Sequence, residues 1–387
     1  MGINVLGLFD GISCGQVALE RAKIKINNYY ASEIDKYAIQ ITQKNYPNTI
    51  QLGDINNWKN WNIDWANIDL LIGGSPCQGF SFAGKQLNFD DERSKLFFVY
   101  VDILNHIKKL NPNVKFLLEN VKMKDEYRNI ISELLGVKPI KINSSLLSAQ
   151  NRIRLYWCNW GQPSQNLFGS CYLPIPQPRD KKIFLKDIVR NIEEIDPKYF
   201  LRKEQLLKLD FTGLSKKTSS KVQVIANGEK YRKSYRVFDI NGKSETLDTS
   251  QGGGRGLYAL IKIDKTGKIK ENQNKACCLT AGANSGGNHS DMDILLVQIN
   301  RGFNQGRVIV KKSSTLTTGQ WAYNNIAFIK IDDDLYVAIR LPPIECERLQ
   351  TLPDDYTKGV SDTQRYKSLG NGWTVDVIAH ILGGMGE

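Results

Sequence analysis

The chain has 387 residues, with 52 Lys and Arg against 40 Asp and Glu, so its formal net charge is +12. Hydrophobic residues make up 41% and charged residues 24%, which excludes wholesale disorder, collagen-like repeats and coiled coils. No apolar run approaches the roughly 18 residues of a membrane span, and the start lacks a secretory signal. Seven scattered cysteines and three histidines argue against disulfides and zinc. We expect a reduced, cytoplasmic protein without a metal, whose charge permits a polyanionic partner.

Residues 1–160 alternate short apolar runs with amphipathic stretches. Strands are predicted at 4–9, 69–72 and 114–118, and apolar residues recur at helical spacing over 94–110. Strands that alternate with helices predict an α/β fold with a parallel sheet covered on both faces. Ligands of such sheets bind beyond the carboxyl ends of the strands.

A glycine-containing turn, Phe9-Asp10-Gly11-Ile12-Ser13-Cys14-Gly15, follows the first strand directly. Its glycines permit a tight turn and the close approach of a ligand to the backbone. Glu33 has the sequence position, relative to Gly11, of a carboxylate that bonds a ribose diol, and Asp54 could bond an adenine amino group. The segment therefore indicates an adenosine-containing ligand; an ordinary strand–helix turn with solvated acids is the alternative.

A cysteine follows the strand that ends at Ile72, in Gly73-Gly74-Ser75-Pro76-Cys77-Gln78. Cys77 thus lies where a parallel sheet places its active site, and a favoured thiolate there is a nucleophile. The alternative is a free cysteine that acts as a small core residue. Residues 79–93 are mostly polar and small, as in a mobile lid.

Two further polar groups of residues lie next to predicted strands. Glu119-Asn120-Val121 follows a strand, where it suits a buried substrate contact, although Asn120 could instead cap a helix. Gln150-Asn151-Arg152-Ile153-Arg154 precedes an apolar run at 155–157. Strand alternation places both of its arginines on one face, and a charged edge strand is the alternative.

The middle of the chain differs in composition. Residues 161–180 are rich in Pro, Gly, Gln and Ser, which predicts a linker, and 202–236 hold ten basic and three acidic residues. Three weakly similar loop-and-strand units follow, with strands at 257–263, 294–299 and 326–331, and predict a small β-rich domain. Helices are predicted again at 345–349 and 373–382.

Taken together and in this order, the segments resemble the DNA (cytosine-5) methyltransferase family over residues 2–160 and 336–384. Its catalytic motif is similar to Pro76-Cys77-Gln78. The tenth motif usually contains Gly-Asn-Ser, whereas this chain has Gly370-Asn371-Gly372 followed by Trp373. Other matching segments are Phe9–Gly15, Gly84-Lys85-Gln86, Arg93–Leu96 (one residue short between Ser94 and Leu96), Glu119–Val121, Gln150–Arg154, Arg340–Gln350 and Gln364–Gly372.

The resemblance implies a Rossmann-like, S-adenosylmethionine-dependent methyltransferase fold with a doubly wound, mostly parallel sheet. Residues 1–160 and 336–387 would form the catalytic and cofactor-binding domain, and 161–335 a smaller β-rich target-recognition domain. The implied reaction flips a cytosine out of duplex DNA and adds Cys77 to its C6. C5 then takes the methyl group of S-adenosyl-L-methionine, which leaves S-adenosyl-L-homocysteine.

The resemblance also assigns site residues. Glu119 would bond the base at N3 and its amino group, and Arg154, with Arg152 near it, would orient the base. The implied cofactor-binding residues are Phe9, Asp10, Gly11, Ile12, Gly15, Glu33, Ile34, Asp54, Ile55, Gly74, Pro76, Asn371 and Trp373. The expected DNA-binding residues are Gln78, Ser81, Ala83, Gly84, Lys85, Gln86, Arg93 and Arg255, and other candidates for base reading lie in 251–255, 284–289 and 320–325.

The expected partner is double-stranded DNA, with no membrane and no metal, and the expected state is a monomer, with or without an associated restriction endonuclease. Such enzymes are prokaryotic or phage-encoded and act in the cytoplasm at the nucleoid. Three alternatives remain at this point: an RNA methyltransferase of the same fold, a non-catalytic cofactor- or DNA-binding regulator, and a nicotinamide-dependent dehydrogenase. The combination of Cys77, Glu119, Arg152 and Arg154 argues against the regulator, and the dehydrogenase leaves Pro76-Cys77 and Glu119-Asn120 unexplained.

Overall fold

The computed structural model describes residues 2–75, 92–161, 163–166, 169–172, 175–191, 194–201, 209–210, 224–228, 237–239, 242–247, 257–263, 292–297, 308–309, 326–331 and 334–385. The chain forms two compact units. The first contains Met1–Ser148, Arg152–Lys182 and Glu347–Glu387, and the second contains Ala149–Asn151 and Ile183–Cys346. The main boundaries therefore follow residues 182 and 346, whereas the sequence placed the domain boundaries after 160 and 335.

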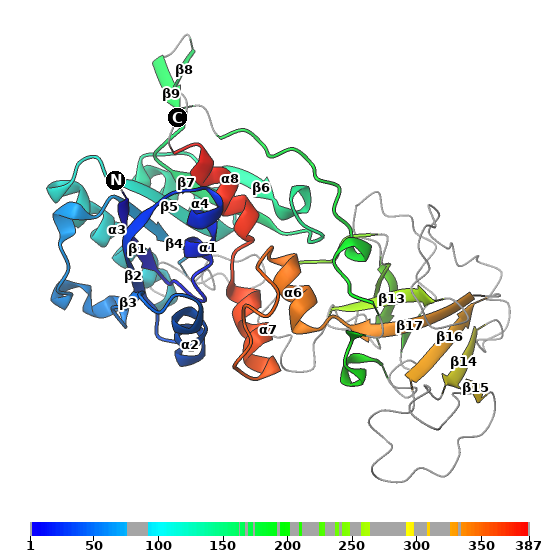
Figure 1. Cartoon of the computed structure of the whole chain (residues 1–387). Helices are drawn as coiled ribbons and strands as arrows, with labels where there is room; N and C mark the ends of the chain where they lie inside the picture. The colour runs from blue at the N-terminus through cyan, green and yellow to red at the C-terminus, as the bar shows by residue number, and fades with distance from the viewer. Residues whose placement is uncertain are drawn as a thin grey trace. The chain divides into compact units, whose positions relative to one another are not determined.

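Seven strands of the first unit form one sheet, in the order β3-β2-β1-β4-β5-β7-β6 among the described residues (Figure 1). They are β1 (Ile3–Leu8), β2 (Ile26–Ser32), β3 (Ile50–Gln51), β4 (Leu70–Gly73), β5 (Lys115–Val121), β6 (Ile140–Asn143) and β7 (Ile153–Cys158). Neighbouring strands are parallel except at β7, which is antiparallel to both β5 and β6. The expected doubly wound, mostly parallel sheet is confirmed.

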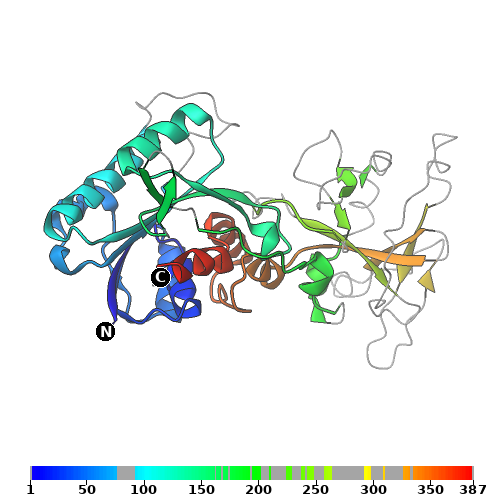
Figure 2. The ribbon, with the colours of Figure 1, turned by 90° about the horizontal axis from the view of Figure 1, so that it is seen from above.

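Helices cover both faces of this sheet. Figure 2 shows α3 and α4 on one face and α1 and α8 on the other. The α-helices are α1 (Cys14–Arg21), α2 (Lys36–Asn45), α3 (Glu92–Leu110), α4 (Asp125–Leu135), α6 (Pro343–Leu349), α7 (Asp362–Asn371) and α8 (Val375–Gly383), and short 3₁₀ turns are η1 (Ile55–Asn60), η2 (Trp65–Asn67) and η3 (Ser144–Leu146). The predicted helix at 94–110 lies within α3, and none of the described helices is long and apolar enough to cross a membrane.

The apolar residues of α3 recur at helical spacing because they form the face of the helix that is buried against the sheet. Phe97 and Tyr100 are fully buried against Phe116 and Trp157 of the strands. Burial of each large side chain stabilises the fold by roughly 1.5–3 kcal/mol. This packing holds β4 and β5 in register, and both strands end at the same edge of the sheet.

The strand order changes direction between β1 and β4. The chain leaves β1 toward β2 and β3 and then returns to the other side of β1 to form β4 and β5. A crevice forms beyond the carboxyl ends of strands at such a switch point, and it is the usual ligand site of open α/β sheets. The polar segments that follow β1, β2, β4 and β5 all open onto this edge.

The second unit contains an eight-stranded sheet, in the order β10-β11-β12-β13-β17-β16-β14-β15 within the described segments. Its strands are β10 (Leu209–Asp210), β11 (Val224–Gly228), β12 (Val237–Asp239), β13 (Tyr258–Ile263), β14 (Met292–Val297), β15 (Val308–Ile309), β16 (Ile326–Ile331) and β17 (Asp334–Arg340), with 3₁₀ turns η4 (Leu185–Asp187) and η6 (Pro197–Tyr199). The three predicted repeat strands correspond to β13, β14 and β16. Because β17 pairs with β13 and β16, residues 336–340 belong to this unit.

Residues 161–180, read as a linker from their composition, contain two short strands of the first unit. They are β8 (Pro163–Asn166) and β9 (Gly169–Tyr172), which pair antiparallel as a small separate sheet. Antiparallel backbone pairing can therefore occur in a segment whose composition carries mostly turn signals.

Candidate active site

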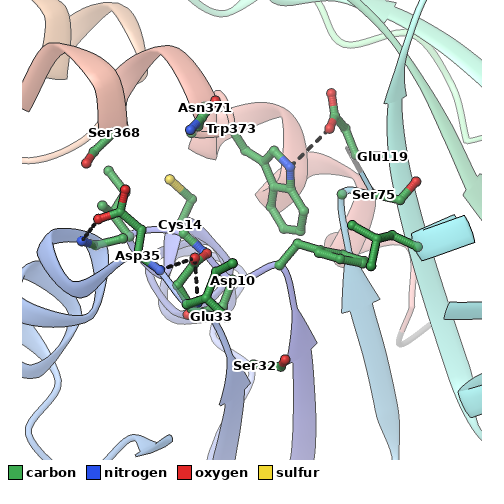
Figure 3. A pocket seen from close by; sticks show the side chains of 18 of the residues that line it. Asp10, Cys14, Ser32, Glu33, Asp35, Ser75, Glu119, Ser368, Asn371 and Trp373 are labelled. Carbon is green, nitrogen blue, oxygen red and sulfur yellow. Dashed lines mark hydrogen bonds between the residues drawn. The ribbon is translucent and has the colours of Figure 1, made fainter. Parts of the chain in front are cut away.

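A cavity of about 480 Å³ opens at the carboxyl ends of the strands of the first unit (Figure 3). Its walls come from the segments after β1, β2, β3, β4 and β5, from β7, and from the turn between α7 and α8. Fourteen of the residues proposed from the sequence line it: Phe9, Asp10, Gly11, Ile12, Glu33, Ile34, Asp54, Ile55, Gly74, Glu119, Arg152, Arg154, Asn371 and Trp373. The volume lies within the range of small-molecule and cofactor sites.

The turn between β1 and α1 has an unusual backbone. Phe9, Gly11 and Ser13 have φ angles of 55°, 59° and 55°. Gly11 tolerates this left-handed conformation without strain, whereas Phe9 and Ser13 do so at a cost that recurs at functional sites. The turn carries Phe9 and the Gly11 backbone to the cavity wall.

Asp10 fixes this turn from beneath. Its carboxylate accepts hydrogen bonds from the Tyr29 hydroxyl, at 2.6 Å, and from the Ser13 hydroxyl. Burial raises the pKa of the Asp10 carboxyl from 3.8 to about 6, and these two hydrogen bonds offset part of the rise. Asp10 is therefore ionised at neutral pH and protonated in mild acid.

Glu33, just past β2, is held by backbone donors. One carboxylate oxygen accepts from the Gly11 N–H at 2.8 Å, and the other accepts from the N–H groups of Ile34 and Asp35, both at 2.8 Å. These bonds orient the carboxylate toward the cavity that it lines. A carboxylate oxygen can accept two hydrogen bonds, so Glu33 keeps one acceptor position, on the oxygen that bonds Gly11, for a ligand hydroxyl.

The cavity lining also includes an exposed apolar side chain, Ile34, and a further acid, Asp54. Ile34 is 75% exposed, the largest exposed fraction among the large hydrophobic side chains of the described segments. Asp54 caps η1 and accepts from the backbone and side-chain amides of Asn56, both at 2.9 Å. The cavity lining thus combines an exposed apolar side chain with two carboxylates whose orientation is fixed by hydrogen bonds.

Glu119 and Arg154 form a partly buried ion pair in the same cavity. Arg154 Nε lies 2.9 Å from Glu119 Oε1, and the two side chains are 14% and 12% exposed. β5 and β7 run antiparallel, and this pairing brings Glu119 and Arg154 together although they are distant in the sequence. The pair presents a fixed carboxylate and a cation to whatever enters.

Arg152 lies deeper than Arg154 and bonds to the C-terminal turn. It is only 3% exposed, and its Nη2 donates to the carbonyl oxygens of Gly370 at 3.3 Å and Gly372 at 3.0 Å. Burial lowers the pKa of the Arg152 guanidinium to about 9, so it stays protonated at neutral pH. Arg152, just before β7, and Arg154, within it, therefore have different partners: the carbonyl oxygens of the C-terminal turn and the Glu119 carboxylate.

Gln350 holds the same turn from the other side. Its side-chain amide donates to the carbonyl oxygens of Leu369 at 2.7 Å and Gly372 at 3.2 Å, and it accepts from the Thr374 hydroxyl at 3.0 Å. Gln350 is fully buried. A segment near the end of the chain is thus fixed at the cavity, with Asn371 and Trp373 in its wall.

Trp373 reaches across the cavity to Glu119. Its indole Nε1 donates to Glu119 Oε2 at 3.2 Å, as the dashed line in Figure 3 shows. Gly74 makes room for this contact, because an added Cβ would lie 3.0 Å from Trp373 Nε1 and 3.1 Å from Glu119 Oε2. Both carboxylate oxygens of Glu119 therefore have fixed partners.

Cys14 is a cysteine that the sequence analysis did not single out as chemically active, although it lines the cavity. Burial raises the pKa of its thiol to about 12. A thiol with this pKa is almost entirely protonated at neutral pH and is a poor nucleophile. Cys14 therefore does not compete with Cys77 as a candidate nucleophile.

Several residues named from the sequence lie elsewhere. Gly15 does not line the cavity; it lets α1 approach β4, since an added Cβ would lie 2.4 Å from Ile72 Cδ1. Arg93 belongs to α3, but its side chain lies outside the described structure. Also outside the described residues are Pro76, Cys77, Gln78, Ser81, Ala83, Gly84, Lys85, Gln86 and Arg255, with the recognition candidates in 251–255, 284–289 and 320–325.

The cavity also contains residues to which the family resemblance assigns no role, among them Asn120, which the sequence indicated only as a buried substrate contact or a helix cap. Asn120 donates to Ser75 Oγ at 3.2 Å and so ties the end of β5 to the end of β4. Asp35 caps α2 and pairs with Lys367 Nζ at 2.6 Å. The polar residues after strands could have indicated Ser75 and Asn120. The Asp35–Lys367 pair joins distant parts of the chain, and the sequence contains no local signal for it.

Solved structures share this fold. The chain superposes on the Entamoeba histolytica methyltransferase EhMeth with a TM-score of 0.58 and 16% identity, over 99% of this chain and 97% of that one. For a variant of DNMT2 from Spodoptera frugiperda the TM-score is 0.56 and the identity 19%, over 100% of both chains. These identities support the fold alone, which is that of a Rossmann-like methyltransferase.

Sequence relatives cover nearly the whole chain. The orphan methyltransferase M.SPRI of Bacillus phage SPR is 26% identical over 98% of this chain and 96% of its own, and the type II methyltransferase M.BanI of Aneurinibacillus aneurinilyticus is 28% identical over 99% and 95%. The type II methyltransferase M.HhaI of Haemophilus parahaemolyticus is 24% identical over 100% and 95%. The model of the family described as C-5 cytosine-specific DNA methylase matches residues 3–387. The chain therefore belongs to the C-5 cytosine-specific DNA methylase family and is a DNA cytosine-5 methyltransferase.

Proposed function

We propose that the cavity holds S-adenosyl-L-methionine at one end and a flipped cytosine at the other, and that Cys77 is the nucleophile. One observation carries this assignment. The carboxylate of Glu119, fixed by Arg154 at 2.9 Å, lines the same cavity as Phe9, Glu33 and Asp54. A site for an adenosine-containing ligand and a pair suited to a pyrimidine edge are thus joined in one space.

The donors and acceptors at the first end fit the cofactor. Glu33 retains one acceptor position for a ribose hydroxyl, and Asp54 can accept from an adenine amino group. Phe9 and the exposed Ile34 side chain offer apolar surface to the adenine ring. When bound, the cofactor supplies an electrophilic methyl group. The chain's own residues orient it and exclude water from the cavity.

The residues at the second end fit the base. Glu119 accepts from the cytosine amino group and from a proton at N3, and Arg154 keeps the carboxylate oriented. The Cys77 thiolate forms a bond to C6, and the electron pair of the C5–C6 double bond makes C5 nucleophilic. After C5 is methylated, its proton leaves to a base, the C6–sulfur bond breaks, and the thiolate is restored.

The second unit is proposed to read the target sequence in double-stranded DNA. This unit includes the basic run 202–236, with ten basic and three acidic residues. Lys and Arg bind phosphates and supply affinity without sequence information, whereas polar residues such as Arg255 can read base edges. The enzyme is proposed to act as a monomer, with no requirement for a restriction endonuclease.

Transfer of a labelled methyl group from S-adenosylmethionine to unmethylated genomic DNA tests this proposal, with 5-methylcytosine mapped at base resolution. We expect the wild type to methylate one short sequence context. Cys77→Ser should abolish transfer, and Glu119→Gln should lower it by at least about 100-fold. Each variant should bind S-adenosylhomocysteine as the wild type does.

The matched control is Glu126→Gln, which changes an acid in the first turn of α4 that does not line the cavity. Its activity should equal that of the wild type. If Cys77→Ser methylates DNA at the wild-type rate, Cys77 is not the nucleophile. If a folded, cofactor-binding wild type transfers no methyl group to DNA, the assignment fails and RNA becomes the next substrate to test.

A further inference from the structure

We infer that Trp373 is a positioning residue for base recognition, in addition to its place in the cofactor cavity. This inference rests on the proposed role of Glu119. The indole Nε1 of Trp373 donates to Glu119 Oε2 at 3.2 Å, while Arg154 Nε contacts Oε1 at 2.9 Å. With one fixed donor on each oxygen, the plane of the carboxylate is set before a base arrives.

The donors on Glu119 leave it able to bind substrate. Each carboxylate oxygen carries two lone pairs, so Oε1 and Oε2 can each accept another hydrogen bond. A carboxylate that is already oriented loses less conformational freedom when it binds its substrate. Trp373 thus contributes to catalysis through Glu119, without itself touching the reacting atoms.

The backbone around Trp373 is built to hold the indole in place. Arg152 and Gln350 both donate to the carbonyl oxygen of Gly372, at 3.0 Å and 3.2 Å. The next residue, Thr374, donates to Gln350 and accepts from the buried Ser144 hydroxyl at 2.9 Å. The residues on either side of Trp373 are therefore fixed by buried hydrogen bonds, and this limits where its ring can lie.

Gly74 gives an independent indication of the same contact. An added Cβ at this position would lie 3.0 Å from Trp373 Nε1 and 3.1 Å from Glu119 Oε2. Only a glycine leaves the Trp373–Glu119 hydrogen bond undisturbed. The φ angle of Gly74 is not in the left-handed region, so its requirement is one of space.

The chain departs here from the family's usual tenth motif. Where Gly-Asn-Ser is typical, Gly370-Asn371-Gly372 is followed by Trp373, and no serine stands at position 372. Gly372 also packs closely, since an added Cβ would lie 3.3 Å from Cys14 Sγ and 3.3 Å from the Ser368 carbonyl oxygen. A serine side chain at position 372 would therefore crowd Cys14 and the end of α7.

Trp373→Phe tests the inference, because it removes the N–H donor and keeps an aromatic ring. We expect the single-turnover rate of methyl transfer to DNA to fall by about tenfold, while the dissociation constant for S-adenosylhomocysteine changes by less than about twofold. Gly74→Ala should lower the rate in the same direction. The indole ¹⁵N–¹H resonance of Trp373, assigned by its loss in Trp373→Phe, should shift when Glu119 is replaced by Ala.

Trp160→Phe is the matched control. Trp160 is buried, and its Nε1 donates to the Ile381 carbonyl oxygen at 3.0 Å, away from the cavity. This variant should lose stability and keep the wild-type rate per folded molecule. An unchanged rate in Trp373→Phe, a loss of cofactor affinity as large as the loss of rate, or an indole resonance indifferent to Glu119→Ala would each overturn the inference. Failure of the wild type to methylate DNA would instead overturn the proposed function.

Discussion

At the scale of single residues, the cavity combines acids in contrasting surroundings. Asp10 is held beneath the β1–α1 turn by Tyr29 and Ser13, and burial raises the pKa of its carboxyl to about 6. Glu33 is bound by three backbone N–H groups, and Glu119 by Arg154 and Trp373. The carboxylates that face the proposed ligands are thus oriented by charged, indole or backbone donors, whereas Asp10 supports the turn.

The raised pKa of Asp10 predicts a specific dependence of stability on pH. Neutral Asp10 favours the folded state, so its contribution is fully present below about pH 4 and is lost as the pH rises through about 6. Asp10→Asn stays neutral throughout and should exceed the wild type in free energy of unfolding by about 3 kcal/mol at pH 7.5. The difference should vanish below pH 4. Urea unfolding across this pH range measures it, and a difference independent of pH would contradict the assignment.

The Glu119–Arg154 pair predicts a loss of activity when the cation is removed. Arg154→Met leaves the Glu119 carboxylate partly buried without its main partner, so methyl transfer should fall by about 100- to 1,000-fold. Arg154→Lys keeps a charge but loses the planar donor geometry, and its rate should be intermediate. Arg128→Met is the control, since Arg128 pairs with the exposed Asp125 on α4. Steady-state transfer with tritiated cofactor gives the rates; equal losses in both methionine variants would refute the role of Arg154.

At the scale of elements, local sequence patterns were sufficient for several of the strands and for α3. Apolar runs in the sequence predicted β1, β4, β5 and β7, because a strand that is buried on both faces consists of consecutive apolar residues. Two elements differed from expectation. The helix predicted from 373 begins at Val375, because Gly372 and Trp373 form the turn that Arg152 and Gln350 hold. Residues 161–180 contain β8 and β9, whose pairing with one another has no periodic apolar signal in the sequence.

The turn between α7 and α8 is held by the buried side-chain amide of Gln350, so we expect the fold to require this amide. Gln350→Leu removes the donor to Leu369 and Gly372 and leaves the Thr374 hydroxyl without its acceptor. The free energy of unfolding should fall by about 2–3 kcal/mol, with a parallel loss of cofactor affinity. Gln40→Leu is the control: its amide donates to the Gly359 carbonyl oxygen at the exposed surface, so the change should stay within about 0.5 kcal/mol. Thermal unfolding measures the stability of the two variants, and calorimetric titration measures their cofactor affinity. Equal losses in Gln350→Leu and Gln40→Leu would contradict the role of Gln350 in holding the turn.

At the scale of the whole molecule, the net charge of +12 predicts a strong salt dependence of DNA binding. If the enzyme neutralises about six phosphates, its affinity for DNA should fall by about 10³ between about 50 and 200 mM salt. The affinity of the enzyme for S-adenosylhomocysteine should change little with salt, because this ligand binds in a partly buried cavity and not along a charged surface. Fluorescence anisotropy with a labelled duplex measures the first and calorimetry the second. A DNA affinity insensitive to salt would exclude phosphate contacts as the main source of binding.

The organisation of the whole chain was harder to predict than its motifs. The family resemblance placed the recurring residues, but Asp35–Lys367 and Arg152–Gly372 join segments that are far apart in the sequence. Such contacts depend on the three-dimensional path of the chain, which no local pattern encodes. The boundary near residue 346 follows from the pairing of β17 with β13 and β16, a register that a single divergent sequence does not specify.

The turn at 370–373 forms one wall of the cavity, so the cavity cannot be completed until these residues have been synthesised. Synthesis delivers Phe9 and Gly11 first, whereas Trp373 and the Gly372 carbonyl oxygen, which lie far from them in the sequence, arrive much later. A nascent chain still threaded through the exit tunnel can form its central sheet but lacks one wall of the cavity. A premature stop anywhere before residue 370 therefore yields a product that cannot modify the genome of the cell that made it.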